Sequence, residues 1–478
     1  MVAGASAYLV AGRVWSQAAS LLMMLVAVRV LEPAEFGAYA LVGTTVLMVQ
    51  LAAEGGWYEY AARGSKNEQP PPELFWCTLG AGLFGWLIVM LCALVVYLFF
   101  QAPKYAGAMA ILSTAPLFGT VYGLQFGMHT RNQTLFRIPS VLIPAELIGL
   151  IVGVAGLLSG MGVTALAIQK AVVGGILTVG VVSWGGWIAP VAFSVSRAKS
   201  VLKYVFNFSA SRIIALTRSG ANDYFLAATL GVADVGIFRA GGRLVSAVGE
   251  AINEPVRMAA WAVLPRAQSS DGDDGFNVAL SQTIIAVFAA SAPAFVGLAL
   301  LSEELVSLLL GERWLAAAPV LALLSFTRVL ALLTTIITPV LGVKGFAHKA
   351  PFVTAATSVI QLCVLFAFGW RGVVWAAAAH LAGAFIGMVY NYRVMIQISK
   401  MPLGGLLSPL AKVAGSCGVM AVVVLLAGTA ATNWPAAASI AVQIVAGVFS
   451  YCMAVFILRV DPMYTYAVNI FRKFSFST

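Results

Sequence analysis

Apolar runs of about 20 residues recur from end to end of this chain, and they constrain its fold more than any other feature. A run of this length spans the hydrocarbon core of a bilayer as an α-helix. The runs are continuously apolar and rich in Leu, Ala and Gly, and they lack the period-two alternation of membrane barrel strands. Because 61% of the residues are hydrophobic and 10% are charged, an ordinary soluble globule is excluded. The sequence therefore predicts an all-α polytopic membrane protein.

About fourteen membrane spans are predicted from these runs, at residues 8–28, 37–56, 74–99, 106–127, 138–158, 163–187, 205–230, 236–261, 276–301, 315–341, 351–369, 372–391, 408–428 and 436–458. The connections between the fifth and sixth spans and between the eleventh and twelfth are very short, so those pairs should form tight hairpins. The longest connections, 57–73 and 257–276, are expected to be soluble loops.

The seventh and eighth spans differ from the others because both carry charge. Residues 208–257 contain Arg212, Arg218 and Asp223 in the first run, and Arg239, Arg243, Glu250, Glu254 and Arg257 in the second. In a helix, the charges of the second run and Ser246 lie on one face, within an arc of about 80°. A charge facing lipid is costly, so this face should line a wet cavity or contact a partner helix. The alternative is a set of buried structural ion pairs.

An internal repeat relates the start of the chain to this charged hairpin. Residues 31–39 align with residues 230–238 in the pattern Leu, two variable residues, Ala, acid, apolar, Gly, apolar, aromatic. The same register places Arg13 on Arg212. A repeat is a signal about the whole fold, and it predicts six-helix lobes at 1–200 and 201–400. Two additional transmembrane helices and a cytoplasmic tail then occupy 401–478.

The distribution of Lys and Arg predicts the topology. With the N-terminus in the cytoplasm, most basic residues lie on the inner side, so both termini are expected to be cytoplasmic and the 303–314 connection periplasmic. The formal net charge of +10 is then explained by an inner surface that faces anionic lipid, and it requires no nucleic-acid partner. The five cysteines and three histidines are scattered and do not predict a metal site.

Three segments resemble signatures of bacterial polysaccharide flippases. Residues 31–41, LEPAEFGAYAL, are similar to the LGPxDFGLYAL signature that follows the first helix of that family. Residues 160–169, GMGVTALAIQ, resemble its GxGVWALVxQ segment, with Thr164 where Trp is common. Residues 310–321, LGERWLAAAPVL, resemble its LGxxWxxAxPxL segment. The resemblance covers almost the whole chain in the expected order. The family that the chain resembles is the O-antigen and exopolysaccharide flippase branch of the superfamily that includes multidrug and toxin extruders and lipid II flippases.

This resemblance implies two six-helix lobes around a central cavity, plus extra C-terminal helices. It implies that the protein carries an undecaprenyl-diphosphate-linked oligosaccharide from the cytoplasmic to the periplasmic leaflet of the bacterial inner membrane. A polysaccharide polymerase and export machinery would be its partners. Relatives line the cavity with cationic residues from the first helices of each lobe.

The chemistry of the charged residues agrees with that implication. Arginine stays charged and grips phosphate oxygens through two parallel hydrogen bonds, so the candidate substrate-binding residues are Arg13, Arg212, Arg218, Arg239 and Arg243. Arg243 is the best candidate for a direct phosphate ligand. The candidate ion-coupling residues, for a proton or a sodium ion, are Asp223, Glu250, Glu254 and Glu54, and Glu146 is a further intramembrane acid. The alternative for Asp223 is a salt bridge to Arg212 or Arg218.

Two other functions compete with the flippase. A cation-coupled exporter of small amphiphiles has the same fold, although five intramembrane arginines argue against cationic drugs as cargo. A membrane glycan polymerase or ligase would need a sizeable periplasmic catalytic loop, and the sequence contains none.

Overall fold

The computed structural model describes residues 2–63, 70–184, 187–188, 193–400 and 404–461. The regular secondary structure of these residues is helical, as the sequence predicts. The chain forms two compact units, Met1–Gly236 and Ile237–Thr478, and each is described by itself.

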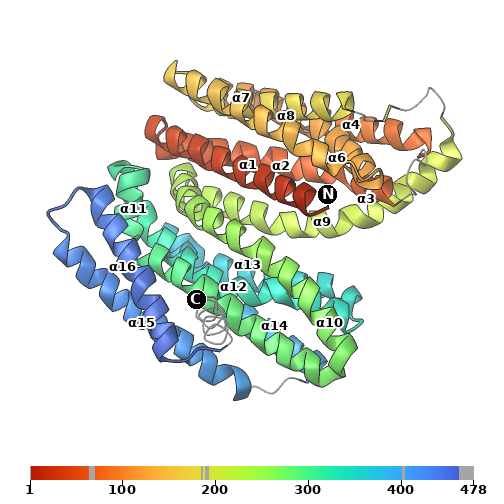
Figure 1. The fold of residues 1–478 in the computed structure, drawn as a ribbon. Coiled ribbons are helices and arrows are strands. Elements are labelled where there is room, and N and C mark those ends of the chain that lie inside the picture. The colour runs from red at the N-terminus through yellow and green to blue at the C-terminus, as the bar shows by residue number, and fades with distance from the viewer. Residues whose placement is uncertain (1, 64–69, 185–186, 189–192, 401–403, 462–478) are drawn as a thin grey trace. The chain divides into compact units, whose positions relative to one another are not determined.

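Unit 1 contains the helices labelled in red to yellow-green in Figure 1. They are α1 (Val2–Val30), α2 (Pro33–Glu54), α3 (Trp57–Ala62), α4 (Pro72–Phe99), α5 (Pro103–Leu112), α6 (Thr114–Arg131), α7 (Ile138–Leu158), α8 (Val163–Ser183) and α9 (Val195–Thr229). Helix α7 packs against both α1 and α8, whereas α9 lies along α2 and also contacts α3 and α4. Helices α2, α4 and α5 begin at Pro33, Pro72 and Pro103. Proline is favoured at a first helical position because it has no N–H that would be left unpaired there.

Unit 2 contains the remaining helices. They are α10 (Val232–Leu300, whose first turn belongs to unit 1), α11 (Ser302–Leu309), α12 (Ala318–Val343), α13 (Ala350–Phe368), α14 (Val373–Ser399), α15 (Gly404–Ala430) and α16 (Ala436–Ile457). Helix α14 packs against α12 and α13, and α15 packs against α16. The Tyr451 hydroxyl donates a 2.6 Å hydrogen bond to the Ala289 carbonyl, which joins α16 to the buried second half of α10.

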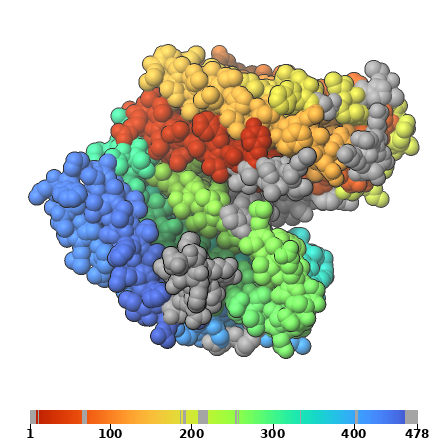
Figure 2. Space-filling model, viewed as in Figure 1, coloured from red at the N-terminus to blue at the C-terminus, as the bar shows by residue number. Residues whose placement is uncertain are grey.

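Twelve helices of the described part of the chain are long and apolar enough to cross a membrane. Their outer sides are apolar: α15 and α16 form the blue surface in Figure 2, and α16 exposes Val445 and Phe449 to 68% and 69%. Such surfaces need hydrocarbon around them, so the chain is a multi-pass membrane protein. The other two predicted spans, 205–230 and 236–261, are helical within α9 and α10 but are not among the twelve. The total of fourteen spans stays a prediction.

Both predicted tight hairpins are confirmed. The α7–α8 connection contains Gly160 and Gly162, with φ of 82° and 57°, and α13 reaches α14 through a short 3-10 turn and Gly372, with φ of 144°. These positive values favour glycine because it lacks a Cβ.

The predicted soluble loop at 257–276 is much shorter in the structure, because two helical segments of α10 meet at a kink at Gly272 (φ 64°, ψ −143°). Asp271, Asp273 and Asp274 beside the kink are exposed, as expected for a solvated connection. Leu264 and Phe276 are fully buried in the core of unit 2, and Lys344 donates hydrogen bonds to Gln268 (2.8 Å) and Asp273 (2.7 Å). Burial of apolar side chains on both sides of the kink therefore keeps this segment helical.

The first part of the 57–73 connection is also ordered, since residues 57–62 form α3. Trp57 is 2% exposed there, because it packs with Leu124 and Val205 in a small core.

The boundary between the compact units does not coincide with the expected lobe boundary at residue 200. Helix α9 belongs to unit 1 because it packs on α2 and α4. The repeat-based lobes 1–200 and 201–400, and the appended segment 401–478, stay predictions.

Candidate functional site

Asp223 is a buried carboxylate on α9 of unit 1, with 1% of its surface exposed. The Thr44 hydroxyl of α2 donates a 2.6 Å hydrogen bond to one of its oxygens, and the Asn222 amide donates a 3.2 Å bond to the other. On the next residues, the hydroxyls of Thr45 and Tyr224 are within hydrogen-bonding distance of each other. Polar pairs between two helices therefore hold this acid in the interior of the unit.

A second polar group lies between α2 and α6. The Gln50 amide donates a 2.7 Å hydrogen bond to the Glu54 carboxylate. This carboxylate packs against Gly119 of α6, where an added Cβ would lie only 2.2 Å from a Glu54 oxygen. Arg13, a predicted substrate ligand on α1, is exposed, and Glu54, a predicted coupling acid, is half-buried.

Glu146 on α7 is a further buried acid of unit 1. It is 6% exposed and accepts a 2.6 Å hydrogen bond from the Ser16 hydroxyl of α1. Its second oxygen is buried without a hydrogen-bond partner among the described residues. Burial of a carboxylate oxygen without a partner is costly, so Glu146 remains a candidate for a functional role.

In unit 2, the predicted polar face of α10 is helical and partly buried. Arg239 and Arg243 are half-buried and Glu250 is exposed. Arg328, from the middle of α12, donates a 3.0 Å hydrogen bond to Ser246 on this face. Its side chain also passes close to Gly249, where an added Cβ would lie 3.8 Å from the Arg328 Nε.

Sequence reasoning missed Arg328, although a signal was present. It is the one charged residue of the apolar run 315–341, and intramembrane charges of this kind are functional candidates by default. The contact with Ser246 adds a sixth arginine to the predicted set and places it on the α10 face.

For three predicted site residues the structure describes the backbone but not the side chain: Arg212, Arg218 and Glu254. Their backbone is helical, but their contacts are not described, so a salt bridge from Asp223 to Arg212 or Arg218 stays untested. The central cavity expected from the sequence concerns both units and also stays a prediction. In the described part of the chain, no group of three His, Cys, Asp or Glu side chains is arranged to hold a metal ion.

The model of the polysaccharide biosynthesis protein family matches residues 26–319, well over half of the chain. The chain belongs to this family. This family member is 22% identical over 323 residues to the succinoglycan biosynthesis transport protein ExoT of Rhizobium meliloti. The aligned region is 67% of this chain and 65% of that relative, so the chain spans a little under two thirds of its length.

Solved structures share the fold of this family member. A lipid II flippase, MurJ, in an inward closed conformation matches with a TM-score of 0.72 at 14% identity, over 93% of this chain and 97% of that one. An inward-facing multidrug resistance transporter of the MATE family, in the MOP superfamily, matches with 0.63 at 14% identity, over 81% and 96%. The MATE multidrug transporter DinF-BH matches with 0.57 at 15% identity, over 82% and 95%. These matches confirm the all-α transporter-like fold expected from the sequence.

Proposed function

We propose that this protein moves an undecaprenyl-diphosphate-linked oligosaccharide from the cytoplasmic to the periplasmic leaflet of the bacterial inner membrane, for O-antigen or exopolysaccharide synthesis. The observation that carries the proposal is the contact between Arg328 and Ser246, which adds an arginine from α12 to the face of α10 that bears Arg239 and Arg243. Family membership supports a glycan precursor as the cargo. Similarity to ExoT, a succinoglycan biosynthesis transport protein, supports movement of such a cargo across a membrane.

A diphosphate head group needs cationic partners because it cannot cross hydrocarbon unaided. Arginine serves this purpose well, since its planar guanidinium binds two phosphate oxygens at once and stays charged inside a membrane protein. Arg239 and Arg243 are half-buried, so they are withdrawn from bulk solvent yet remain within reach of a ligand. In the proposed mechanism these side chains hold the diphosphate while the lobes alternate between inward-open and outward-open states, as repeat-built transporters do.

The acids are proposed to couple this movement to a proton or a sodium ion. The candidates are Asp223, Glu54, Glu250 and Glu254. The burial of Asp223 beside Thr44 supports the proposal, because an ionisable group within a span is costly unless it is paired or used. Transport in proteoliposomes should respond to pH or sodium, and Asp223→Asn should remove the response if Asp223 is the coupling group. Transport that ignores pH, sodium and membrane potential alike would make these acids structural.

Arg243 is the residue on which the cargo assignment is tested. In cells that depend on this gene, Arg243→Ala should abolish surface glycan while the protein remains in the membrane at the wild-type level. Arg243→Lys should restore only part of the export, because an ammonium group cannot reproduce the two-point contact. Exposed Arg313, which precedes α12, supplies the control: Arg313→Ala should export normally.

The competing explanation is that the arginines serve only as structural partners of the acids. In that case the charge-swapped pair Arg243→Glu with Glu250→Arg should recover export. Recovery by this swap, or normal export by Arg13→Ala, Arg212→Ala and Arg243→Ala singly, contradicts the proposed role in binding diphosphate.

A further inference from the structure

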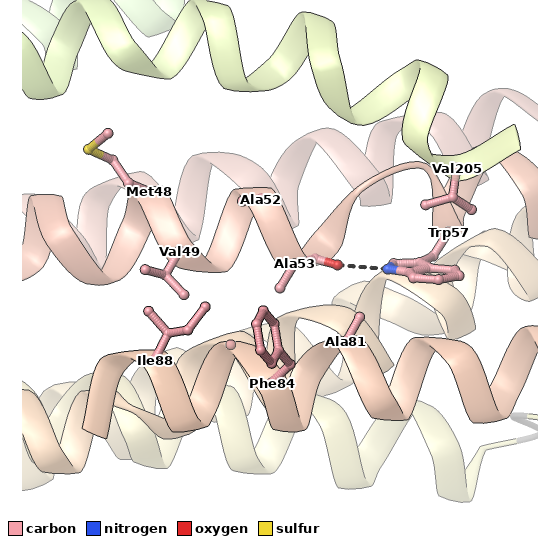
Figure 3. Close-up of a pocket in the computed structure, with 10 residues that line it drawn as sticks. Met48, Val49, Ala52, Ala53, Trp57, Ala81, Phe84, Ile88 and Val205 are labelled. Carbon is pink, nitrogen blue, oxygen red and sulfur yellow. Dashed lines mark hydrogen bonds between the residues drawn. The ribbon is translucent and has the colours of Figure 1, made fainter. Parts of the chain in front are cut away.

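A cavity of about 430 Å³, open on one side, lies in unit 1 between α2, α4 and the first half of α9 (Figure 3). Its walls are apolar and include Met48, Ala52, Trp57, Phe84, Ile88 and Val205. The Trp57 indole N–H is already bonded to the Ala53 carbonyl at 2.7 Å, as the dashed line shows. The volume is in the range of roughly 300–1,000 Å³ that is typical of ligand pockets. The walls therefore suit a hydrocarbon ligand.

Because α4 is long and apolar enough to span a membrane, the cavity is expected at the depth of the hydrocarbon core. Ala81 and Ile88, which line it, are about 14 and 24 Å along α4 from Pro72 at a rise of 1.5 Å per residue. Phe84 is 64% exposed at this level. Apolar side chains at such a depth meet lipid chains rather than water.

One end of the cavity leads towards a cation. Trp57 and Val205 lie at this end in Figure 3. Tyr60 lies one turn after Trp57 on α3, and Tyr204 directly precedes Val205 on α9. The Arg63 guanidinium lies over both tyrosine rings, 3.7 Å from the centre of Tyr60 and 4.5 Å from the centre of Tyr204. Among the described residues no acidic side chain pairs with Arg63. An apolar cavity with a positive charge at one end is complementary to a lipid that has an anionic head group.

We propose that this cavity holds part of the isoprenoid chain of a polyprenyl-phosphate-type lipid, with its phosphate end towards Arg63. The assignment rests on the proposed function, because it gives the hydrophobic tail of the cargo a binding site separate from the arginine-bearing face of α10. A tail held against α2 and α4 would keep the lipid on the protein while its glycan crosses. One cavity beside one cation suits a single-chain lipid phosphate better than a two-chain phospholipid.

Native mass spectrometry of the purified full-length protein tests the proposal, with undecaprenyl phosphate as the probe and phosphatidylglycerol as the comparison lipid. Ala52→Phe is designed to fill the cavity from α2, at a lining position whose side chain is exposed. Leu47→Phe is the matched control, because Leu47 is 45% exposed on the same helix and does not line the cavity. Arg63→Gln removes the cation and leaves the cavity open.

Binding of undecaprenyl phosphate should fall about tenfold in Ala52→Phe, as expected for the loss of a few buried methylene contacts. It should be unchanged in Leu47→Phe and weaker in Arg63→Gln, whereas binding of phosphatidylglycerol should be the same in all four proteins. Unchanged binding of the probe in Ala52→Phe overturns the proposal. An equal loss of binding of both lipids would also overturn it, because the cavity would then bind ordinary phospholipid. A wild-type protein that does not bind undecaprenyl phosphate would overturn it as well. The export assay with Arg243→Ala reads transport independently, so failure of the cavity and failure of the proposed function give different results.

Discussion

Gly37 and Gly236 occupy equivalent positions in the two copies of the repeat, and they lie against each other. A Cβ on Gly37 would come within 1.9 Å of the Val232 carbonyl oxygen, and a Cβ on Gly236 would come within 2.1 Å of the Pro33 carbonyl oxygen. Pro33 and Val232 are themselves equivalent in the repeat, so the contact is reciprocal. The glycine common to both copies is explained by this close approach of the start of α2 to the first turn of α10.

Alanine at either glycine should push these two backbones apart. The obstacle is a carbonyl oxygen and not a flexible side chain, so Gly37→Ala and Gly236→Ala should each lower the free energy of unfolding by about 1–3 kcal/mol. Thermal unfolding of the purified protein in detergent measures the effect. Gly43→Ala on the same helix is the control, because an added Cβ there meets nothing within 4 Å. It should be neutral or stabilising by up to about 1 kcal/mol, and equal loss of stability in all three variants would contradict the steric explanation.

Thr44→Val should destabilise the protein more than Thr45→Val. Valine at residue 44 removes the hydrogen bond to the buried Asp223 carboxylate, and an unsatisfied buried polar group costs about 1–3 kcal/mol. Thr45 contacts the Tyr224 hydroxyl in a more exposed place, so the polar groups left by its loss can reach solvent. The comparison is made by thermal unfolding. If Asp223→Asn restores the stability of Thr44→Val, the cost comes from the carboxylate charge.

Arg328→Ala should abolish export as completely as Arg243→Ala, with protein retained in the membrane. Ser246→Ala should have a smaller effect, because it removes one neutral partner of Arg328 and leaves the charge in place. Surface glycan and membrane protein level are both measured. Normal export by Arg328→Ala would exclude this arginine from the binding face. Loss of protein from the membrane would instead assign it a structural role in joining α12 to α10.

The topology is tested by cysteine labelling in intact cells, in a background without Cys77, Cys92, Cys363, Cys417 and Cys452. Glu304→Cys on α11 is exposed and should react with an impermeant maleimide, because the 303–314 connection is expected to be periplasmic. A cysteine added after Thr478 should react only after the cells are opened. The reverse pattern would place both termini outside and contradict the positive-inside prediction.

The sequence by itself determined the class of the protein, twelve of the helical spans, the tight hairpins and the family. These properties depend on local and additive quantities: the length of an apolar run, the glycines of a short turn and the residue pattern of three segments. It also identified the charges in residues 208–257, since charge within an apolar run is visible without a structure.

Only the tertiary structure decided which polar groups meet. Thr44 and Asp223 are 179 residues apart in sequence, and Ser246 and Arg328 are 82 apart, so no local pattern reports these contacts. The extent of the helices on either side of the Gly272 kink is not visible in the sequence for the same reason: the segment resembles a loop by composition, but Leu264 and Phe276 are buried by helices distant in sequence. The reciprocal contact of Gly37 with Gly236 likewise depends on how α2 meets α10. Side-chain partnership in a helical membrane protein is set by packing between helices, and the periodicity of a single helix specifies only which face is available.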